Sequence, residues 1–259
     1  MLAACSNVIN TQEISPEEII SNAAMQMQNL NAVHAEFSGF IINKTTDTDQ
    51  SIRFNGNGDI IIDLAQYSIN ASFETQSGTS GAAAKTLSGV LDVFINTEET
   101  FYKISNLTYP KLNLELTEQN EDWYKVENTQ GVSNGMRYIN PNLYTVKKYN
   151  GVTASNGENS HHLEVVLNNS IIPELQAFTG VTLTAQLWID TTTFNVNRIG
   201  WDIKTKDQAN ELSLQIDLTQ HNNVSPVNAP TNYIDSSTAG ESTLINPDKF
   251  IEELLQEVR

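Results

Sequence analysis

Apolar and polar residues alternate along most of the chain, from residue 33 to about residue 218. In the first of these runs, Val33, Ala35 and Phe37 alternate with polar side chains. Because successive side chains of a β-strand point to opposite faces, such a run places apolar residues on one face and polar residues on the other. This pattern is typical of antiparallel strands that cover a core on one side only. The alternation therefore predicts a large antiparallel sheet with one apolar face.

The number of these runs constrains the shape of the sheet. We count about eleven or twelve of them, whereas strongly twisted open sheets rarely exceed about ten strands without curling. The sequence therefore predicts an α+β fold in which a strongly curved antiparallel sheet, a half-open β-barrel of about 11 strands, has helices covering its concave apolar face.

Polar segments between the runs predict the connections. Four of them have the composition of hairpin turns: residues 55–59, 96–99, 190–195 and 206–210. Residues 77–85 and 150–160 are rich in Gly, Ser, Thr, Ala or Asn, which predicts two mobile loops. The strands are therefore expected to follow one another as a meander.

A capping box predicts a helix near the start of the chain. Ser15 is suited to the N-cap, Pro16 to the first helical position and Glu18 to the third. Apolar residues then recur at helical spacing: Ile19, Ile20, Ala23, Ala24, Met27 and Leu30. Proline-led segments predict further helices at residues 140–144, 172–180 and 247–258.

The single cysteine lies at position 5, in the run Leu2-Ala3-Ala4-Cys5. This is the pattern that lipoprotein signal peptidase reads, so we expect Cys5 to carry a diacylglyceryl group and to become the new amino terminus. The basic and apolar segments of a signal peptide are missing in front of it, and we interpret the sequence as trimmed there. No apolar run approaches the roughly 18 residues of a membrane span, so attachment to a membrane is expected through Cys5. The alternative is a free or buried thiol.

The charge balance limits the kinds of molecule that this chain could bind. Lys and Arg number 14 against 31 Asp and Glu, which gives a net charge of −17. Such a chain has no basic patch for phosphates, which argues against nucleic acid, and anionic lipid headgroups would repel it unless it is tethered. One cysteine also excludes an internal disulfide and a cysteine-rich zinc site.

The predicted helices are too few to cover the whole concave face of so wide a sheet. We therefore expect an apolar cavity between the helices and the sheet, which would serve as a ligand site. Its expected lining consists of apolar residues from the first helix and the strands: Ile20, Met27, Phe37, Phe73, Leu114, Leu187, Trp201 and Leu214. An acyl chain buried there would gain roughly 0.8 kcal/mol per CH₂ group. The alternative is that these side chains simply pack against one another as a core.

The sequence contains short matches to enzyme and metal-binding motifs, but the surrounding residues do not fit those functions. Residues 131–135 match the G-x-S-x-G pattern of a nucleophile elbow around Ser133, but they lie in an Asn/Gly loop between antiparallel elements. His161 and His162 are adjacent on a strand, so they point to opposite faces and do not share a metal. Asp47 and Asp49 lack the ligand spacing of an EF-hand. We therefore expect no catalytic residue, no metal and no cofactor.

Several short motifs occur in the order found in one family. They are the cysteine run, the Ser15-Pro16-Glu17-Glu18 helix start, the strand at 33–39, and the segments 122–126, 187–190, 198–199 and 221–230. In these motifs the chain resembles the LolA-like superfamily of bacterial envelope lipoproteins, especially the LppX/LprG-type lipid carriers, over most of residues 15–233. The resemblance implies a half-open β-barrel, closed by helices, that holds acyl chains in transit through the cell envelope.

The resulting expectation is a non-enzymatic, monomeric lipoprotein that binds a lipid or an acylated ligand for transport or sorting. It would be extracytoplasmic and held to the membrane by lipidated Cys5, with a possible envelope protein as partner. We expect a linker over residues 1–14, the half-barrel over 15–233, and a polar linker with an amphipathic helix over 234–259. Two alternatives remain: an interaction or stress-sensing module with a collapsed cavity, and an esterase at Ser133.

Overall fold

The computed structural model describes most of the predicted sheet and its leading helix. The described residues are 14–44, 48–79, 85–108, 122–127, 144–167, 184–204 and 210–235. The predicted helices at 172–180 and 247–258, together with Cys5, Leu114 and Ser133, lie outside these residues. Of the predicted helix at 140–144 only Tyr144 is described, and it begins a strand.

The described strands form one largely antiparallel sheet of twelve, close to the predicted number of about 11. The last strand, at residues 233–235, lies beyond the residues in which the alternation was found. In chain order they are β1 (Ala32–Lys44), β2 (Thr48–Ile61), β3 (Gln66–Thr79), β4 (Lys85–Ile95), β5 (Glu99–Thr108), β6 (Trp123–Glu127), β7 (Tyr144–Ser155), β8 (Glu158–Leu167), β9 (Thr184–Asp190), β10 (Val196–Lys204), β11 (Asn210–Thr219) and β12 (Tyr233–Asp235). Their order in space is β12-β6-β5-β4-β3-β2-β1-β11-β10-β9-β8-β7. Neighbours are antiparallel except β12, which runs parallel to β6.

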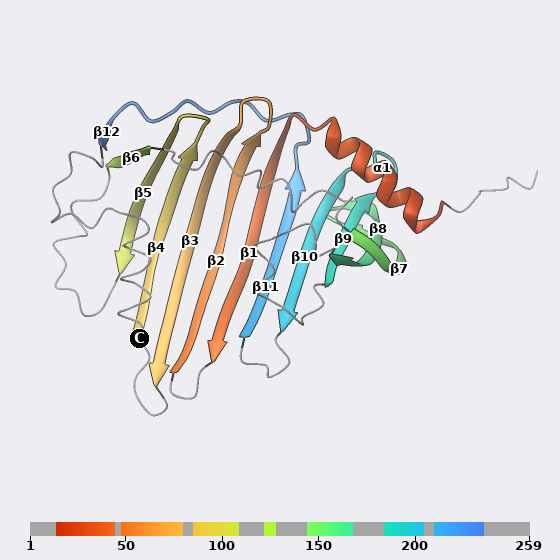
Figure 1. The fold of residues 1–259 in the computed structure, drawn as a ribbon, viewed down its shortest axis with the longest axis horizontal. Helices are drawn as coiled ribbons and strands as arrows, with labels where there is room; N and C mark the ends of the chain where they lie inside the picture. The colour runs from red at the N-terminus through yellow and green to blue at the C-terminus, as the bar shows by residue number, and fades with distance from the viewer. Residues whose placement is uncertain are drawn as a thin grey trace, which may run out of the picture.

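The sheet is open, and the prediction of a strongly curved half-barrel was wrong in this respect. Its order ends with β12 at one side and β7 at the other, and these two strands do not pair. Figure 1 shows a broad, twisted sheet rather than a closed or strongly curled one. Open sheets of about 8–15 strands do occur, so a sheet of this width does not require closure.

The leading helix α1 (Pro16–Gln28) begins as the capping box predicts. The Ser15 hydroxyl accepts a hydrogen bond from the Glu18 amide at 3.2 Å. Ile19, Ile20 and Ala23 are buried in a core with residues of β1 and β7 to β11. In Figure 1, α1 lies at the end of the sheet that holds β8 and β9, so it covers one part of the apolar face rather than its whole width.

Loss of this cap should weaken the docked helix. Ser15→Ala removes the acceptor for the Glu18 amide, which should lower the free energy of unfolding by about 1 kcal/mol. Ser21 is exposed in the middle of α1, so Ser21→Ala is a matched control and should change stability by only a few tenths of a kcal/mol. Urea denaturation of the three proteins measures the difference, and equal midpoints for Ser15→Ala and the parent chain would exclude a role for the cap.

The connections are partly as predicted. Turns at 96–98 and 191–193 join successive strands, and residues 205–209, between β10 and β11, lie outside the described part. The predicted hairpin turn at 55–59 was wrong, because these residues lie within β2. The predicted loop at 150–160 was also wrong, since β7 and β8 meet in a tight hairpin at Asn156 and Gly157, both with positive φ. Asn and Gly tolerate that conformation, which favours a two-residue turn.

A strap of residues 220–232 runs from β11 along one end of the sheet to β12 (Figure 1). Asn222 anchors its start, where its Oδ1 accepts a hydrogen bond from the Asn31 amide at 2.6 Å. Further along, the Gln66 side chain donates to the Val227 carbonyl and accepts from the Val227 amide. The strap therefore fixes β12 beside β6, where Tyr233 packs against the buried ring of Phe101.

Candidate functional site

Two rows of small or apolar residues cross the apolar face of the sheet, each with one residue per strand. Residues directly opposite one another on neighbouring strands share a face. The first row, in spatial order, is Leu163, Leu187, Ile199, Ile216, Phe37, Gly56, Ala71, Leu91 and Ile104. The second is Ala185, Trp201, Leu214, Gly39, Phe54, Phe73 and Gly89. The face is therefore continuous from β8 to β5.

Burial changes along the first row although its chemistry does not. Leu163 and Ile199 are fully buried and Leu187 is 1% exposed, all within the core that includes α1. From Ile216 to Ile104 the row is only partly buried. Along this row the boundary falls between Ile199 on β10 and Ile216 on β11, although the core packed on α1 also includes Leu218 of β11 and Val33 of β1.

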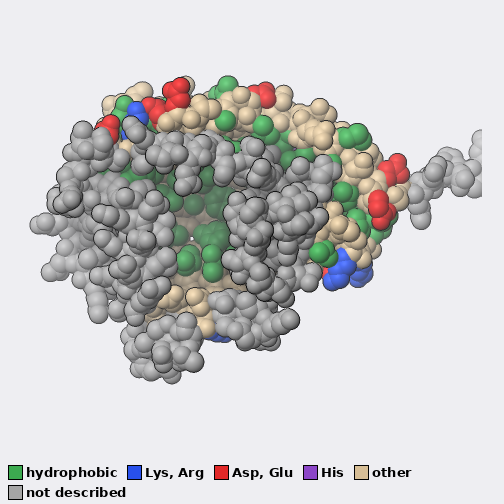
Figure 2. Space-filling view, viewed as in Figure 1, with side chains coloured by type: hydrophobic (Ala, Val, Ile, Leu, Met, Phe, Trp, Pro, Cys, Tyr) green, Lys and Arg blue, Asp and Glu red, His purple; other side chains and the backbone are tan. Residues whose placement is uncertain are grey.

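We call the partly buried region the open floor. It consists of Phe37, Phe54, Ala71, Phe73, Leu91, Trp201, Leu214 and Ile216, with Gly39 and Gly56 among them. Figure 2 shows hydrophobic side chains gathered in the middle of the face in view. The buried region is called the closed core, and it includes Ile19, Ile20, Leu163, Val165, Leu187 and Ile199.

Two phenylalanine rings of the open floor lie over glycines of the neighbouring strand. A Cβ atom on Gly56 would lie 2.8 Å from Phe37 Cζ, and one on Gly39 would lie 2.8 Å from Phe54 Cζ. The two ring centroids are 6.5 Å apart. The same Cβ atoms would lie still closer to backbone, namely to the Asn70 carbonyl oxygen at Gly56 and to the Ser213 carbonyl oxygen at Gly39. A side chain at either position would therefore clash with a neighbouring strand as well as with the ring, which accounts for the glycine inside β2, where the sequence had predicted a turn.

The predicted cavity residues divide between the two regions. Phe37, Phe73, Trp201 and Leu214 lie together on the open floor. Ile20 and Leu187 belong to the closed core, and Met27 packs against it with partial exposure, as does Trp201 at the border of the open floor. Leu114 and Cys5 lie outside the described residues. Phe54, which was not among the predicted residues, lies in the second row between Gly39 and Phe73.

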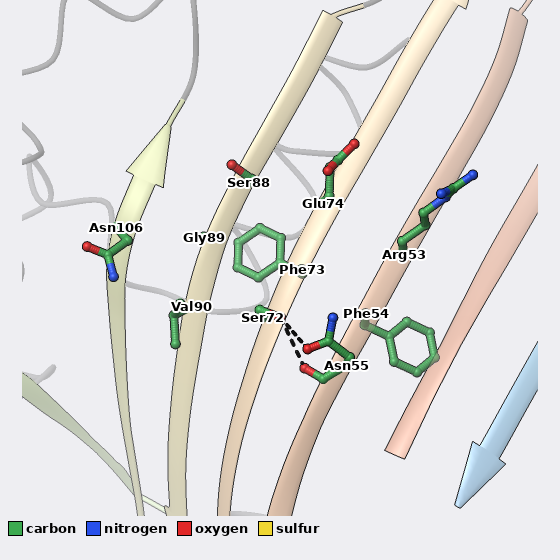
Figure 3. Close-up of a pocket in the computed structure, with 10 residues that line it drawn as sticks. All are labelled: Arg53, Phe54, Asn55, Ser72, Phe73, Glu74, Ser88, Gly89, Val90 and Asn106. Carbon is green, nitrogen blue, oxygen red and sulfur yellow. Dashed lines mark hydrogen bonds between the residues drawn. The ribbon is translucent and has the colours of Figure 1, made fainter. Parts of the chain in front are cut away.

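The opposite face of the sheet is polar and holds a pocket of about 430 Å³. Figure 3 shows this pocket, with Arg53 at one side and Asn106 at the other. The Ser72 hydroxyl in its middle donates to Asn55 Oδ1 at 2.7 Å. This pocket was not predicted from the sequence, because the polar residues of each alternating run were expected to face solvent.

The two adjacent histidines point to opposite faces, as predicted. His161 is hydrogen-bonded to the Tyr149 hydroxyl at 3.0 Å, and His162 stacks on Trp188 with 4.4 Å between ring centroids. Burial lowers the pKa of His161, although the Asp190 carboxylate acts in the opposite direction. Asp190 is itself the cap of a turn, where its Oδ1 accepts hydrogen bonds from Thr192 and Thr193.

No catalytic arrangement emerges around these groups. Burial raises the pKa of Asp190, but the hydrogen bonds from Thr193 and Thr192 and the charge of His161 outweigh it, so the pKa lies below its usual value.

Within the described residues, no three His, Cys, Asp or Glu side chains come together so as to hold a metal ion. In the same part of the chain, no helix has the length and hydropathy needed to cross a membrane.

A partly buried histidine, His221, predicts a loss of stability at mildly acidic pH. Burial lowers the pKa of His221, whereas the Val196 carbonyl, Glu158 and Asp190 act in the opposite direction. Protonation is therefore less favourable in the folded chain than in the unfolded chain. Stability is retained above the unfolded pKa of about 6.5 and falls as the pH drops below it.

His221→Gln should reduce this pH dependence, because glutamine can still donate to the Val196 carbonyl but does not titrate. Urea midpoints at pH 7 and pH 5.5 measure the effect. The decrease between the two pH values should be smaller in the variant than in the parent chain. The same decrease in both proteins would show that His221 does not contribute.

Comparison with known proteins gives similarity of fold only. No family model matches the sequence, and no curated protein matches it. Among solved structures, the chain is similar to the lipoprotein LppX of Mycobacterium tuberculosis, with 11% identity and a TM-score of 0.48 over 83% of this chain and 100% of that one. It is also similar to MucB in its complex with MucA(peri), with 9% identity and a TM-score of 0.28 over 85% of this chain and 62% of that one. A DUF1329 family protein from Desulfovibrio piger has 11% identity and a TM-score of 0.26, over 78% of this chain and 90% of that one.

Proposed function

We propose that this chain is a non-enzymatic carrier that binds a lipid or a lipidated molecule by its acyl chains on the open floor. The observation that supports this is the change of burial along one apolar row. Leu187 and Ile199 are covered by protein, whereas Phe37 and Leu91 in the same row are partly exposed. Contiguous apolar surface that stays partly exposed in a folded chain is a typical feature of binding sites.

The open floor has the chemistry that an acyl chain needs. Its side chains are uncharged, and three of them are phenylalanines on adjacent strands: Phe37, Phe54 and Phe73. At roughly 0.8 kcal/mol per buried CH₂, a long acyl chain gains on the order of 10 kcal/mol before the costs of ordering are subtracted. Binding of this kind requires apolar contact and no reactive group.

The proposal includes a place in the cell. Residues 1–14 would carry the lipid anchor at Cys5 and a linker, residues 15–233 the carrier domain, and residues 234–259 a linker with an amphipathic helix. The protein would be monomeric and would act in the extracytoplasmic cell envelope, in transport or sorting. The net charge of −17 would keep the body away from anionic headgroups, so the anchor rather than charge would hold it near the membrane.

An interaction module with a collapsed cavity is the second candidate, and one observation favours it. The space between α1 and strands β8 to β10 is filled by side chains, including Ile19, Leu163 and Leu187. This part of the sheet leaves no room for a ligand. The open floor lies beyond it, which is why we favour the carrier.

Mass spectrometry of the protein purified from a bacterial host tests the carrier function. The full chain should contain extractable acyl species, and Cys5→Ser should retain them while losing any covalent lipid mass. Retention in Cys5→Ser would separate lipid bound on the sheet from lipid attached to the anchor. Ligand-free preparations of both proteins, together with no uptake of a fluorescent fatty acid, would contradict the proposal.

A further inference from the structure

The pocket on the polar face is built by two short rows of side chains from three adjacent strands. In one row Arg53, Glu74 and Ser88 lie opposite one another. In the next row are Asn55, Ser72 and Val90. The residues between the rows, Phe54, Phe73 and Gly89, also line the pocket. By alternation the rings of Phe54 and Phe73 point to the open floor, so these residues turn their backbone toward the pocket. The pocket therefore lies on the other side of the sheet from the open floor.

A β-bulge adds a seventh side chain to this pocket. The pairing of β4 with β5 shifts between Ser88 and Val90, so that β5 has one residue more than β4 at this point. Asn106 lies in the extra segment and has a φ of +54°. Regular alternation would place Asn106 on the same face as Ile104, but instead it lines the polar pocket. Bulges of this kind redirect a side chain, and they are frequent next to functional sites.

The lining combines hydrogen-bond donors and acceptors in similar measure. Asn55 and Asn106 offer amides that both donate and accept, and the hydroxyls of Ser72 and Ser88 do the same. Arg53 and Glu74 add one charge of each sign, and Gln76 donates to Glu74 at 2.7 Å. A phosphate or carboxylate ligand would need an excess of cations, and an acyl chain would need apolar walls. Hydroxyl groups, which donate and accept together, match this lining best.

The size of the pocket suits a short ligand that carries several hydroxyl groups. Its volume of about 430 Å³ lies within the roughly 300–1,000 Å³ that ligand pockets span. A second pocket of about 300 Å³ adjoins it, and both include Asn55 in their lining. The second pocket adds Ser38, Asn57 and Glu36 from β1 and β2. From β2 to β5 the strand spacing gives about 14 Å, or roughly two or three pyranose rings.

We propose that the polar face carries a binding site for an uncharged oligosaccharide, centred on Asn55 and Asn106. This site is independent of lipid binding, because it lies on the opposite face of the sheet. A carrier with both sites binds a glycan and an acyl chain without competition between them.

Titration of the full chain with maltotriose, cellotriose and tri-N-acetylchitotriose, followed by backbone amide NMR shifts, tests the proposal. At least one trisaccharide should shift the amides around Asn55, Ser72 and Asn106, and leave those of the closed core unchanged. Asn106→Gly should weaken binding at least tenfold, because glycine keeps the positive φ of the bulge but removes the amide. Asn55→Ala should weaken it to a similar extent.

Two controls keep the test specific. Ser213→Ala removes a hydroxyl from the same face, on β11, where Ser213 donates to Asp202 at 2.7 Å outside both pockets, and this variant should bind the glycan normally. Uptake of a fluorescent fatty acid should be the same in Asn106→Gly as in the parent chain. The proposal is overturned if none of the three trisaccharides shifts the pocket amides at 10 mM, or if Asn55→Ala and Asn106→Gly bind as the parent does. Neither result would bear on the lipid carrier.

Discussion

Leu214→Glu should reduce the affinity for a fluorescent fatty acid at least tenfold. Leu214 lies in the second row of the open floor, between Trp201 and Gly39, and is partly exposed. A carboxylate at this position would be covered by the bound acyl chain without a partner, and burying an unpaired charge costs several kcal/mol. A tenfold loss of affinity corresponds to about 1.4 kcal/mol. The effect therefore remains measurable even if rearrangement relieves a large part of the cost of burying the carboxylate.

Two further variants separate burial from other effects of the charge. Thr219→Glu places the same carboxylate on β11 but on the polar face, opposite His34, and should leave fatty acid uptake within twofold of the parent. Leu214→Asn is neutral, and it should weaken binding in the same direction as Leu214→Glu. If Thr219→Glu and Leu214→Glu reduce uptake equally, the open floor is not the binding surface.

Leu187→Ala should destabilise the chain by about 3 kcal/mol, whereas Leu214→Ala should cost about 1 kcal/mol. Both leucines occupy alternating positions on the same apolar face. Leu187 is 1% exposed in the closed core, so its truncation leaves a cavity that its neighbours only partly fill. Leu214 is partly exposed already, so less transfer free energy is lost.

Urea denaturation of the two variants beside the parent chain measures this difference. A saturating fatty acid should stabilise the parent and Leu187→Ala alike, and Leu214→Ala less, since ligand binding adds to stability only in proportion to its affinity. Equal destabilisation by the two substitutions would mean that the closed core and the open floor are one uniform core. In that case the interaction module would be the better description of the chain.

The sequence predicted the features that depend on local pattern. Alternation identified the antiparallel strands and the opposite directions of His161 and His162. The capping box at Ser15 fixed the start of the helix. These features follow from contacts within a few residues or from the period of the strand, which a single sequence records directly.

The errors arose where one residue type serves two purposes. Gly56 and the glycines around it suggested a turn, because glycine tolerates turn conformations. In the structure Gly56 lies inside β2 and makes room for the ring of Phe37, which belongs to another strand. At Asn156 and Gly157 the error was the reverse, because an Asn-Gly pair that forms a hairpin turn had been interpreted as part of a longer loop.

The division between closed core and open floor could not be predicted. Leu187 and Leu214 are the same residue type, and both lie in strands whose apolar residues recur at every second position. Their burial differs because α1 packs against one end of the sheet and does not cover the other. That arrangement depends on contacts between segments far apart in the sequence. So does the open sheet, in which the outermost strands β12 and β7 do not pair. The bulge at Asn106 likewise depends on how β5 pairs with β4.

Photocrosslinking of the full chain with a diazirine-bearing fatty acid, followed by peptide mapping, shows directly which surface contacts the acyl chain. We expect the label on residues of the open floor, foremost Phe37, Phe73 and Leu214, and we expect unlabelled fatty acid to displace it. Leu214→Glu should abolish most of this labelling, and Thr219→Glu should not. Labelling confined to the polar face, or labelling that unlabelled fatty acid does not displace, would contradict the proposal that the open floor binds acyl chains.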